Sequence, residues 1–399
     1  MEVKVEKLDN QGRGIAFVND KITFIEKALP EEVVDIKITK ESKKYQEATV
    51  IEYIKISPSR IESPCPYFKE CGGCDLLDLS YEDTLKYKKE KLESIFSKYA
   101  NINTNIEIIP SDNTLSYRNK ITLKVVNSKI GYYHSSTHKL VEINNCLLAE
   151  KAIENIIPEL KYLNVKNGEI TLRSNYNDEL LIIINTKENC NPNIIPLKKN
   201  HKIAGIILND KVLNGESKFI DIINHKLFNV SYDSFFQVNR SICSKLFQLI
   251  EEYTKDSKVL LDLYCGVGTL GIASNSSVEK AYGIEIVKNA ILNAITNSKI
   301  NKKNNIYYML GDVGECLPKI KDTIDTIIVD PPRAGLDDKT KETILKLKPY
   351  KIIYVSCDPM TLSRDLKELT KYYNVKIVKG LDMFPYTHHC ESIIVLERR

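Results

Sequence analysis

Residues 260–271 have the sequence LLDLYCGVGTLG, in which an apolar run ends at a glycine-rich turn and a second apolar segment follows. A short apolar run bounded by a turn is typical of a buried parallel strand. Gly266 and Gly268 permit a tight turn, and the free N–H groups at the start of a helix can bind polar atoms of a ligand. The stretch therefore predicts a strand, a ligand-binding turn and a helix.

The same alternation continues to the end of the chain. Helical stretches separate most of the strand-like runs, which are VLLDLY, AYGIEI, NIYYML, TIDTIIVD, KIIYVS, VKIVKGLDM and SIIVLE. Alternating strands and helices predict a largely parallel sheet, and the short connection before the last strand predicts an antiparallel pair at the sheet edge. We therefore expect a seven-stranded, Rossmann-like α/β domain over residues 231–399.

Acidic residues follow the first three predicted strands. The glycines alone fit both NAD and S-adenosylmethionine sites, because they also match the G-x-G-x-x-G pattern of dinucleotide folds. Asp262 would repel a pyrophosphate but attract an ammonium group such as that of methionine. Glu285 ends the second strand, where an acid commonly binds ribose hydroxyls, and Asp312 follows the third, where it can accept a hydrogen bond from an adenine amino group.

Three later motifs place reactive side chains at the same edge of the sheet. Asp330 lies in IIVDPPRAGL, Cys357 in VSCDP and Glu391 in MFPYTHHCE. A thiol is only a few per cent thiolate near neutral pH, so Cys357 needs a helix N-terminus or nearby cations to act as a nucleophile. Glu391 is a candidate base, and His388 and His389 compete with it for that role.

Four of the ten cysteines have a spacing typical of a metal or cluster site. Cysteines of a cytosolic protein are mostly reduced, so a tight spacing favours a metal or a cluster over disulfides. Four thiolates suit zinc and an iron–sulfur cluster equally well. The four form a C-x5-C-x2-C group with a distant fourth member: Cys65, Cys71, Cys74 and Cys146.

The first 230 residues differ in pattern from the C-terminal part. Residues 1–58 contain five short strand-like runs, which predict an OB-like β-barrel of the kind used for nucleic acids or for purely structural roles. Residues 59–230 contain the four cysteines, a lysine-rich helix predicted from Tyr81 to about Tyr99, and alternating short strands. We expect them to form a central α+β domain.

Composition and local hydropathy exclude several classes of protein. The N-terminus has no apolar signal-peptide core, and no stretch reaches the roughly 20 apolar residues of a membrane span. We therefore expect a cytoplasmic protein with no membrane partner. The formal net charge of +4 is too small to identify a nucleic-acid-binding protein.

Together, these motifs resemble the RNA uridine-C5 methyltransferases, and more closely the 23S ribosomal RNA branch (RumA or RlmD type) than the transfer RNA branch. The resemblance covers nearly the whole chain. Thr269 and Cys390 depart from the pattern, since asparagine and valine are the usual residues there. The matching features are an N-terminal TRAM barrel, the four cysteines, SYRNKITL, GYYHSSTHKLVEINNC, SFFQVN, DLYCGVGTLG, DPPRAGL, VSCDP and MFPYTHHCE.

The resemblance implies an activity, its cofactors and its site residues. Cys357 would add to C6 of a uracil in 23S ribosomal RNA, S-adenosylmethionine would methylate C5, and Glu391 would remove the C5 proton. The four cysteines would hold a 4Fe-4S cluster with a structural or RNA-positioning role, zinc being the alternative occupant. No obligate protein partner is evident. The positions corresponding to S-adenosylmethionine-binding residues are Gln237, Tyr264, Thr269, Glu285, Asp312 and Asp330.

Three other functions fit parts of the sequence. Transfer RNA is the alternative substrate of the same chemistry. An NAD-dependent dehydrogenase would explain the glycine turn and Glu285, but not Cys357 or the cysteine spacing. A non-catalytic RNA-binding iron–sulfur or zinc protein would explain the barrel and the four cysteines, but not the C-terminal motifs.

Overall fold

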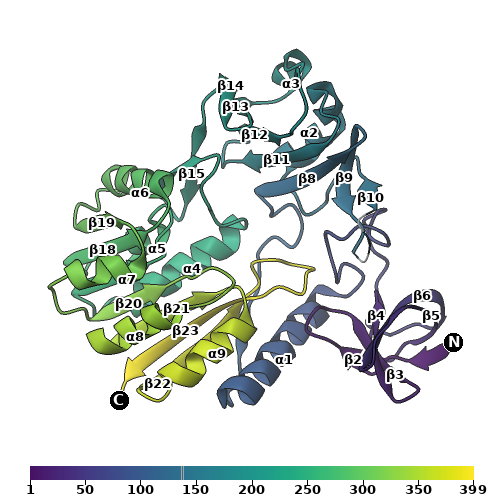
Figure 1. Cartoon of the computed structure of the whole chain (residues 1–399), viewed down its shortest axis with the longest axis horizontal. Helices are drawn as coiled ribbons and strands as arrows, with labels where there is room; N and C mark the ends of the chain where they lie inside the picture. The colour runs from purple at the N-terminus through teal and green to yellow at the C-terminus, as the bar shows by residue number, and fades with distance from the viewer. Residues whose placement is uncertain (136, 138) are drawn as a thin grey trace.

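The computed structural model describes residues 1–135, 137 and 139–399. Ser136 and His138, which belong to the motif at residues 131–146, lie outside the described residues. Figure 1 shows three bodies: the N-terminal strands, a central sheet, and a C-terminal body of helices and strands. None of the helices described is long and apolar enough to cross a membrane.

The N-terminal strands form one curled sheet in the order β1-β5-β6-β4-β3-β2. The expectation of five strands is wrong by one, because the first predicted strand divides. Val5 N donates to Glu32 O (2.9 Å), whereas Glu6 N donates to Ile15 O (2.8 Å), so the chain changes partner strands between these two residues. The strands are β1 (Glu2–Lys4), β2 (Lys7–Leu8), β3 (Gly14–Val18), β4 (Lys21–Glu26), β5 (Val33–Glu41) and β6 (Tyr45–Lys55).

A long helix, α1 (Tyr81–Ala100), leads from the cysteine-rich segment into the rest of the chain and confirms the helix predicted there. Ser80 caps it by accepting a hydrogen bond from Asp83 N (3.1 Å). Its lysines do not form one exposed face. Lys88 is fully buried and forms an ion pair with Asp382, near the C-terminus of the chain.

The central part combines short helices with a mainly antiparallel sheet. Its sheet has the order β10-β9-β8-β11-β12-β13-β14, and β15 and β16 form a separate hairpin. The strands are β8 (Lys120–Val126), β9 (Lys129–Tyr133), β10 (Leu140–Glu142), β11 (Gly168–Ser174), β12 (Leu180–Asn185), β13 (Ile203–Leu208), β14 (Lys211–Gly215), β15 (Lys218–Ile223) and β16 (Lys226–Ser231). The helices are α2 (Lys151–Ile156), the 3-10 helix Ile157–Leu163 and α3 (Ile195–Asn200).

The C-terminal sheet has the order β19-β18-β17-β20-β21-β23-β22-β7. It includes the seven strand-like runs of the C-terminal part, and β7 adds an eighth strand from the segment after α1. An antiparallel edge was expected, but the edge is β7, which is parallel to β22, while the antiparallel strand β23 lies inside the sheet. The strands are β7 (Glu107–Ile109), β17 (Val259–Leu263), β18 (Lys280–Glu285), β19 (Ile306–Leu310), β20 (Thr326–Val329), β21 (Lys351–Ser356), β22 (Tyr373–Leu381) and β23 (Glu391–Arg398).

Helices cover both faces of this sheet. Successive residues of a strand point to opposite faces, so Leu260 and Ile353 join one apolar core while Leu261 and Ile352 join the other. α4 and α5 pack in the first core, and α1, α7, α8 and α9 pack in the second. The helices of the C-terminal part are α4 (Arg240–Tyr253), α5 (Thr269–Ala273), α6 (Lys288–Ile300), α7 (Val313–Cys316), the 3-10 helix Leu317–Lys319, α8 (Asp338–Leu347) and α9 (Pro359–Leu369).

The strand order reverses between β17 and β20, which are neighbours in the sheet. β18 and β19 lie on one side of this pair and β21 lies on the other. In open α/β sheets the crevice at the carboxyl ends of such a pair is where ligands bind. The fold therefore points to the residues just after β17 and β20.

Candidate active site

A pocket of about 340 Å³ lies at the carboxyl ends of β17 and β20. Phe235 and Phe236 form part of its wall beside the glycine-rich turn. Five residues whose side chains were singled out in the sequence also line it, although they come from three separate segments of the chain. These five are Gln237, Asp262, Tyr264, Thr269 and Asp330.

The turn after β17 has an unusual backbone. Tyr264, Gly266 and Gly268 all have positive φ angles, of 60°, 54° and 85°. A Cβ atom at Gly268 would lie 2.5 Å from the hydroxyl of Tyr308, whereas a Cβ at Gly266 would meet nothing within 4 Å. The Tyr264 conformation is costly for a residue with a side chain, and such strain is concentrated at binding sites. No pattern in the sequence indicates this conformation of Tyr264.

Asp262 is the most deeply buried carboxyl group of the pocket, with 2% of its surface exposed. Its Oδ2 accepts a hydrogen bond from Gly271 N (2.9 Å), whereas Oδ1 is buried and has no partner in the part of the chain that is described. Burial raises the pKa of Asp262 to about 8, and the charges of Asp330 and Glu285 add to this rise, although the Gly271 N–H opposes it. A cationic ligand would relieve both the burial cost and the repulsion.

Glu285 and Asp312 lie near the pocket but are not among the described residues that line it. Glu285 accepts hydrogen bonds from Gly266 N (3.1 Å) and Val287 N (2.9 Å), so it is held against the glycine turn. Asp312 caps α7, where it accepts a hydrogen bond from Gly314 N (2.8 Å). The structure thus supports a contact between Glu285 and a ligand more directly than one with Asp312.

Cys357 and Glu391 lie at adjacent strand ends. In the antiparallel pair β21–β23, Ser356 is opposite Ser392. Cys357 follows Ser356 and Glu391 precedes Ser392, so continuing this register places the thiol opposite the carboxyl group. Glu391 is 4% exposed, and Cys357 is half-buried. The two residues therefore lie side by side near the carboxyl end of β20, and the charges of Glu391 and Asp330 both act on the Cys357 thiol.

The reactive groups in the free protein favour their neutral forms. Burial raises the pKa of Cys357 to about 11, and the charges of Glu391 and Asp330 raise it further, against the effect of Arg333. Burial and Asp330 likewise raise the pKa of Glu391 well above its usual value. Burial raises the pKa of Asp330 to about 7. The expected stabilisation of the Cys357 thiolate is thus absent from the free site, because burial and two acids outweigh one arginine.

His389 is neutral at neutral pH. Burial lowers its pKa to about 3, and the nearby charges of His388 and Arg333 contribute. Arg333 therefore influences the thiol, the carboxyl group of Glu391 and the imidazole of His389 at once.

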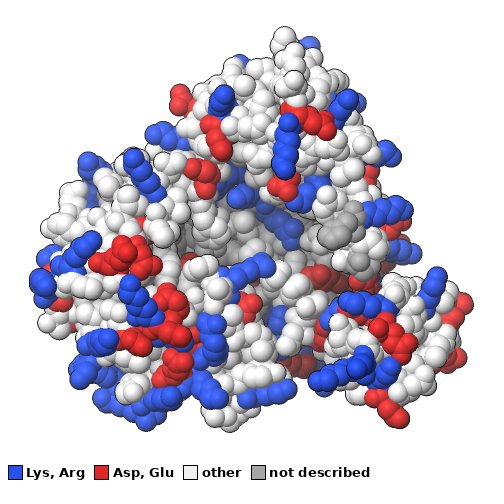
Figure 2. Space-filling model, in the orientation of Figure 1, with Lys and Arg blue, Asp and Glu red and all other residues white. Residues whose placement is uncertain are grey.

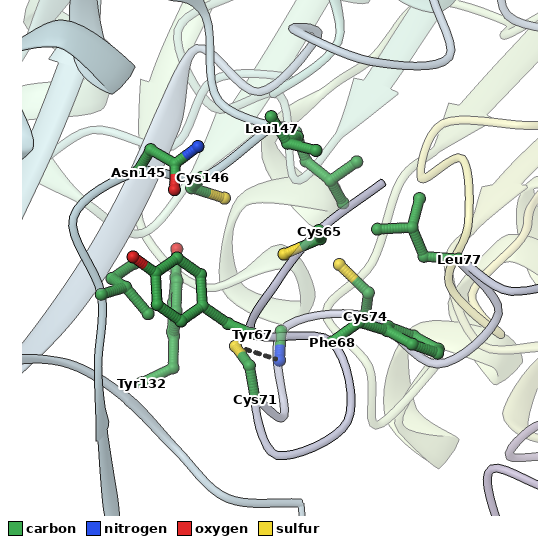
Figure 3. Close-up of a pocket in the computed structure, with 13 residues that line it drawn as sticks. Cys65, Tyr67, Phe68, Cys71, Cys74, Leu77, Tyr132, Asn145, Cys146 and Leu147 are labelled. Atoms are coloured by element: carbon green, nitrogen blue, oxygen red, sulfur yellow. Dashed lines mark hydrogen bonds between the residues drawn. The ribbon is translucent and has the colours of Figure 1, made fainter. Parts of the chain in front are cut away.

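The three cysteines of the C-x5-C-x2-C pattern line one pocket, together with Cys146 from the segment after β10. Figure 3 shows their sulfur atoms pointing into a shared space between Tyr67 and Leu77. Burial raises the pKa of Cys65, Cys71 and Cys74, in the last case to about 12. Among the described residues, no three Cys, His, Asp or Glu side chains are arranged to hold a metal ion.

Arg118, from the SYRNKITL segment, lies beside this pocket. Its Nη2 donates to Gly73 O (3.2 Å), and its Nε donates to the hydroxyl of Tyr117 (3.3 Å). Its charge opposes the rise in the pKa of Cys74. The sequence pattern does not link Arg118 to the cysteines, because Arg118 lies 44 positions after Cys74.

Comparisons with known proteins agree with this architecture. Residues 193–310 and 319–399 match the family described as tRNA (uracil-5-)-methyltransferase, and residues 1–51 match the TRAM domain. The crystal structure of a Pyrococcus abyssi tRNA (uracil-54, C5)-methyltransferase with S-adenosyl-L-homocysteine shares the fold, with a TM-score of 0.81. The two sequences are 24% identical, and the match covers 99% of this chain and 100% of that one.

Full-length relatives are more similar in sequence. A protein of Aquifex aeolicus named as an uncharacterized RNA methyltransferase is 35% identical, over 100% of this chain and 98% of the relative. One of Thermotoga maritima with the same name is 33% identical, over 99% of this chain and 98% of the relative. The resemblance seen in the sequence is thereby confirmed: the chain belongs to the tRNA (uracil-5-)-methyltransferase family of S-adenosylmethionine-dependent RNA methyltransferases.

Proposed function

We propose that the protein methylates C5 of a uridine in RNA, and that its substrate is 23S ribosomal RNA. One observation carries the reaction: the register of β21 and β23 brings Cys357 and Glu391 together beside the pocket at the switch point. The choice of 23S over transfer RNA rests on the sequence resemblance. Transfer RNA is the second candidate, because the matching family and the Pyrococcus abyssi enzyme carry it in their names.

S-adenosylmethionine would supply the methyl group from the pocket at the ends of β17 and β20. Asp262 Oδ1, which has no partner among the residues that the structure describes, would accept a hydrogen bond from its ammonium group, a fit supported by the burial of this atom. Glu285, next to the glycine turn, would bind the ribose. The proposed set of binding residues is Gln237, Tyr264, Thr269, Glu285, Asp312 and Asp330, with Asp262 added.

Cys357 and Glu391 would divide the reaction into easier steps. Cys357 would lose its proton to solvent, the thiolate sulfur would add to C6 of the uracil, and the electron pair of the C5–C6 double bond would shift to make C5 nucleophilic. Once C5 carries the methyl group, Glu391 removes the C5 proton, the double bond re-forms, and the sulfur leaves C6. Arg333 favours the anionic forms of both residues. The target base must leave its stack to reach them.

The four-cysteine pocket would hold a 4Fe-4S cluster with a structural or RNA-positioning role. Its thiols surround one space, which suits either a cluster or zinc, and the choice of the cluster rests on the sequence resemblance. Arg118 would offset part of the negative charge of four thiolates. The cluster would exchange no atom, proton or electron with the substrate during methyl transfer.

Each of the three parts of the chain would have its own role. We assign RNA binding to a TRAM barrel at residues 1–58, the cysteine site to residues 59–230 and methyl transfer to residues 231–399, in a cytoplasmic protein. Figure 2 shows a hollow in the middle of one face, with Lys and Arg side chains along its wall. Such a surface suits the phosphates of a folded RNA.

A methyl-transfer assay with tritiated S-adenosylmethionine tests the proposal on unmodified 23S ribosomal RNA and on transfer RNA. We expect Cys357→Ala to lose at least about 1,000-fold in rate, because the addition step is abolished. Glu391→Gln should accumulate a covalent RNA adduct. Cys190→Ala, a half-buried cysteine away from both pockets, is the matched control. Full activity in Cys357→Ala would refute the mechanism, and methylation of transfer RNA alone would refute the choice of substrate.

A further inference from the structure

The loop that precedes Glu391 is held by the segment that follows the cysteines. Residues 382–390 connect β22 to β23, and Figure 1 shows this loop leaving the sheet toward the coil ahead of α1. Asp75 N and Leu76 N both donate to Tyr386 O, at 3.2 and 3.1 Å. Asp75 directly follows Cys74. Contacts between residues more than 300 positions apart therefore fix the middle of the loop.

Asp75 and His388 form the strongest of these contacts. Asp75 Oδ2 accepts a hydrogen bond from His388 N (3.0 Å) and lies 2.7 Å from His388 Nδ1. One carboxylate oxygen thus fixes both the backbone and the ring of His388. The His388 ring in turn lies against the ring of His389, with the ring centroids 4.0 Å apart. His389 is followed by Cys390 and then by Glu391.

α1 completes the support from the other side. Lys91 Nζ donates to His388 O (2.8 Å) and to Asn10 O in the N-terminal part (2.6 Å). Lys88, one turn earlier, pairs with Asp382 and donates to Phe384 O (2.9 Å). His388 is therefore held through its N–H, its ring and its carbonyl by residues of two other segments.

We propose that Asp75 and His388 are positioning residues for the reaction: by fixing the loop, they hold the Glu391 carboxylate where it can take the C5 proton. This inference rests on the proposed roles of Cys357 and Glu391. Because Asp75 is joined to Cys74, the geometry also links the cysteine pocket to the proton-removal step. The pair should matter for that step and not for cofactor binding, since neither residue lines the described wall of the cofactor pocket.

The test uses the full-length protein with 23S ribosomal RNA and S-adenosylmethionine, and compares Asp75→Ala and His388→Gln with wild type. We expect kcat to fall about 10-fold, the KM for S-adenosylmethionine to change less than about 2-fold, and the covalent RNA adduct to accumulate on a denaturing gel. The double variant should be no slower than the slower single variant, because the two residues act as one unit. Asp75→Asn, which keeps an acceptor oxygen, should recover part of the rate.

Glu70→Ala, an exposed residue of the same segment, is the control and should behave as wild type. A fall in kcat without adduct in Asp75→Ala and His388→Gln would overturn the inference, because a merely structural defect lowers addition and release together. Glu391→Gln runs on the same gel. If it accumulates no adduct, the proposed function fails; if it does and the Asp75 and His388 variants do not, only the positioning role fails.

Discussion

Two pockets of the molecule, one at the strand ends and one lined by cysteines, have similar volumes, about 340 and 380 Å³, but opposite chemistry. The pocket at the strand ends is lined by Asp262 and Asp330, and burial raises the pKa of both acids, with the charge of Asp330 adding to the rise at Asp262. The cysteine pocket is lined by aromatic and aliphatic side chains around its thiols. The first suits a polar cation, and the second suits a soft metal centre or cluster that its apolar lining shields from water.

The pockets also differ in construction. The first is built where strands of one sheet end, so its residues share a rigid frame. The second is built from two loops, residues 65–77 and 143–148, and from Tyr132 of β9. Sites on strand ends gain their geometry from backbone hydrogen bonds, whereas sites on loops need an occupant or many side-chain contacts to fix them. The predictions below test whether the two pockets act independently.

The largest effect on cofactor binding is expected from Asp262→Asn. Loss of the negative charge should raise the dissociation constant for S-adenosylmethionine about 100-fold, or about 2.7 kcal/mol, measured by titration calorimetry. The ligand-free protein should become more stable at pH 8, because the pKa of Asp262 lies above its unfolded value and its ionisation opposes folding as pH rises toward 8. Exposed Asp256→Asn is the control. Unchanged affinity would show that the acid does not bind the ligand.

Arg333→Gln should lower the methyl-transfer rate about 30-fold at pH 7.5. Removing this cation raises the pKa of Cys357 and of Glu391 further, so less of each is ionised. The pH–rate profile should therefore shift to higher pH, and part of the loss should be recovered near pH 9. Exposed Lys339→Gln should leave the profile in place. A uniform loss at all pH values would assign Arg333 to RNA binding instead.

Cofactor binding should depend on pH in the range of the two acid pKa values. Asp262 and Asp330, with pKa values of about 8 and about 7, are largely protonated at pH 6, and a cationic ligand binds their ionised forms. Affinity should therefore fall about 10-fold from pH 8 to pH 6, with proton release on binding. Calorimetry in two buffers of different ionisation enthalpy measures that release. Proton uptake would contradict this sign.

The smallest effect on the cofactor is expected from Cys71→Ser. The dissociation constant for S-adenosylmethionine should change less than about 2-fold, while iron content and thermal stability fall, because only the cysteine pocket is altered. Cys190→Ser is the matched control. A loss of affinity comparable to that of Asp262→Asn would break the comparison, since it would mean that the two pockets are one cooperative site.

The sequence predicted the residues of the strand-end pocket better than those of its surroundings. Parallel strands carry their carboxyl ends to one edge, so Asp262, Asp330 and Cys357 could be brought together from the order of the strands alone. The glycine turn left NAD open as a ligand, and the family match closes that alternative. The roles of the individual site residues stay predictions.

Long-range contacts without a local pattern could not be predicted. β7 is only three residues long, and nothing in its sequence shows that it pairs with β22. Asp75 and His388 are each ordinary surface-type residues, and their contact exists only because the loop and the cysteine segment meet. Arg118 likewise reaches the cysteines only through the fold of the central part.

α1 and β7 have a consequence for how the chain is made. They pack on β22 and α9, which are synthesised some 260 or more residues later. At about 5–20 residues per second, the apolar residues of α1 therefore remain without these packing partners for roughly 15–50 s. During that interval the nascent chain exposes Leu92 and Phe96, which are fully buried in the finished protein. This helix is therefore the segment of the nascent chain on which we expect a holding chaperone to bind.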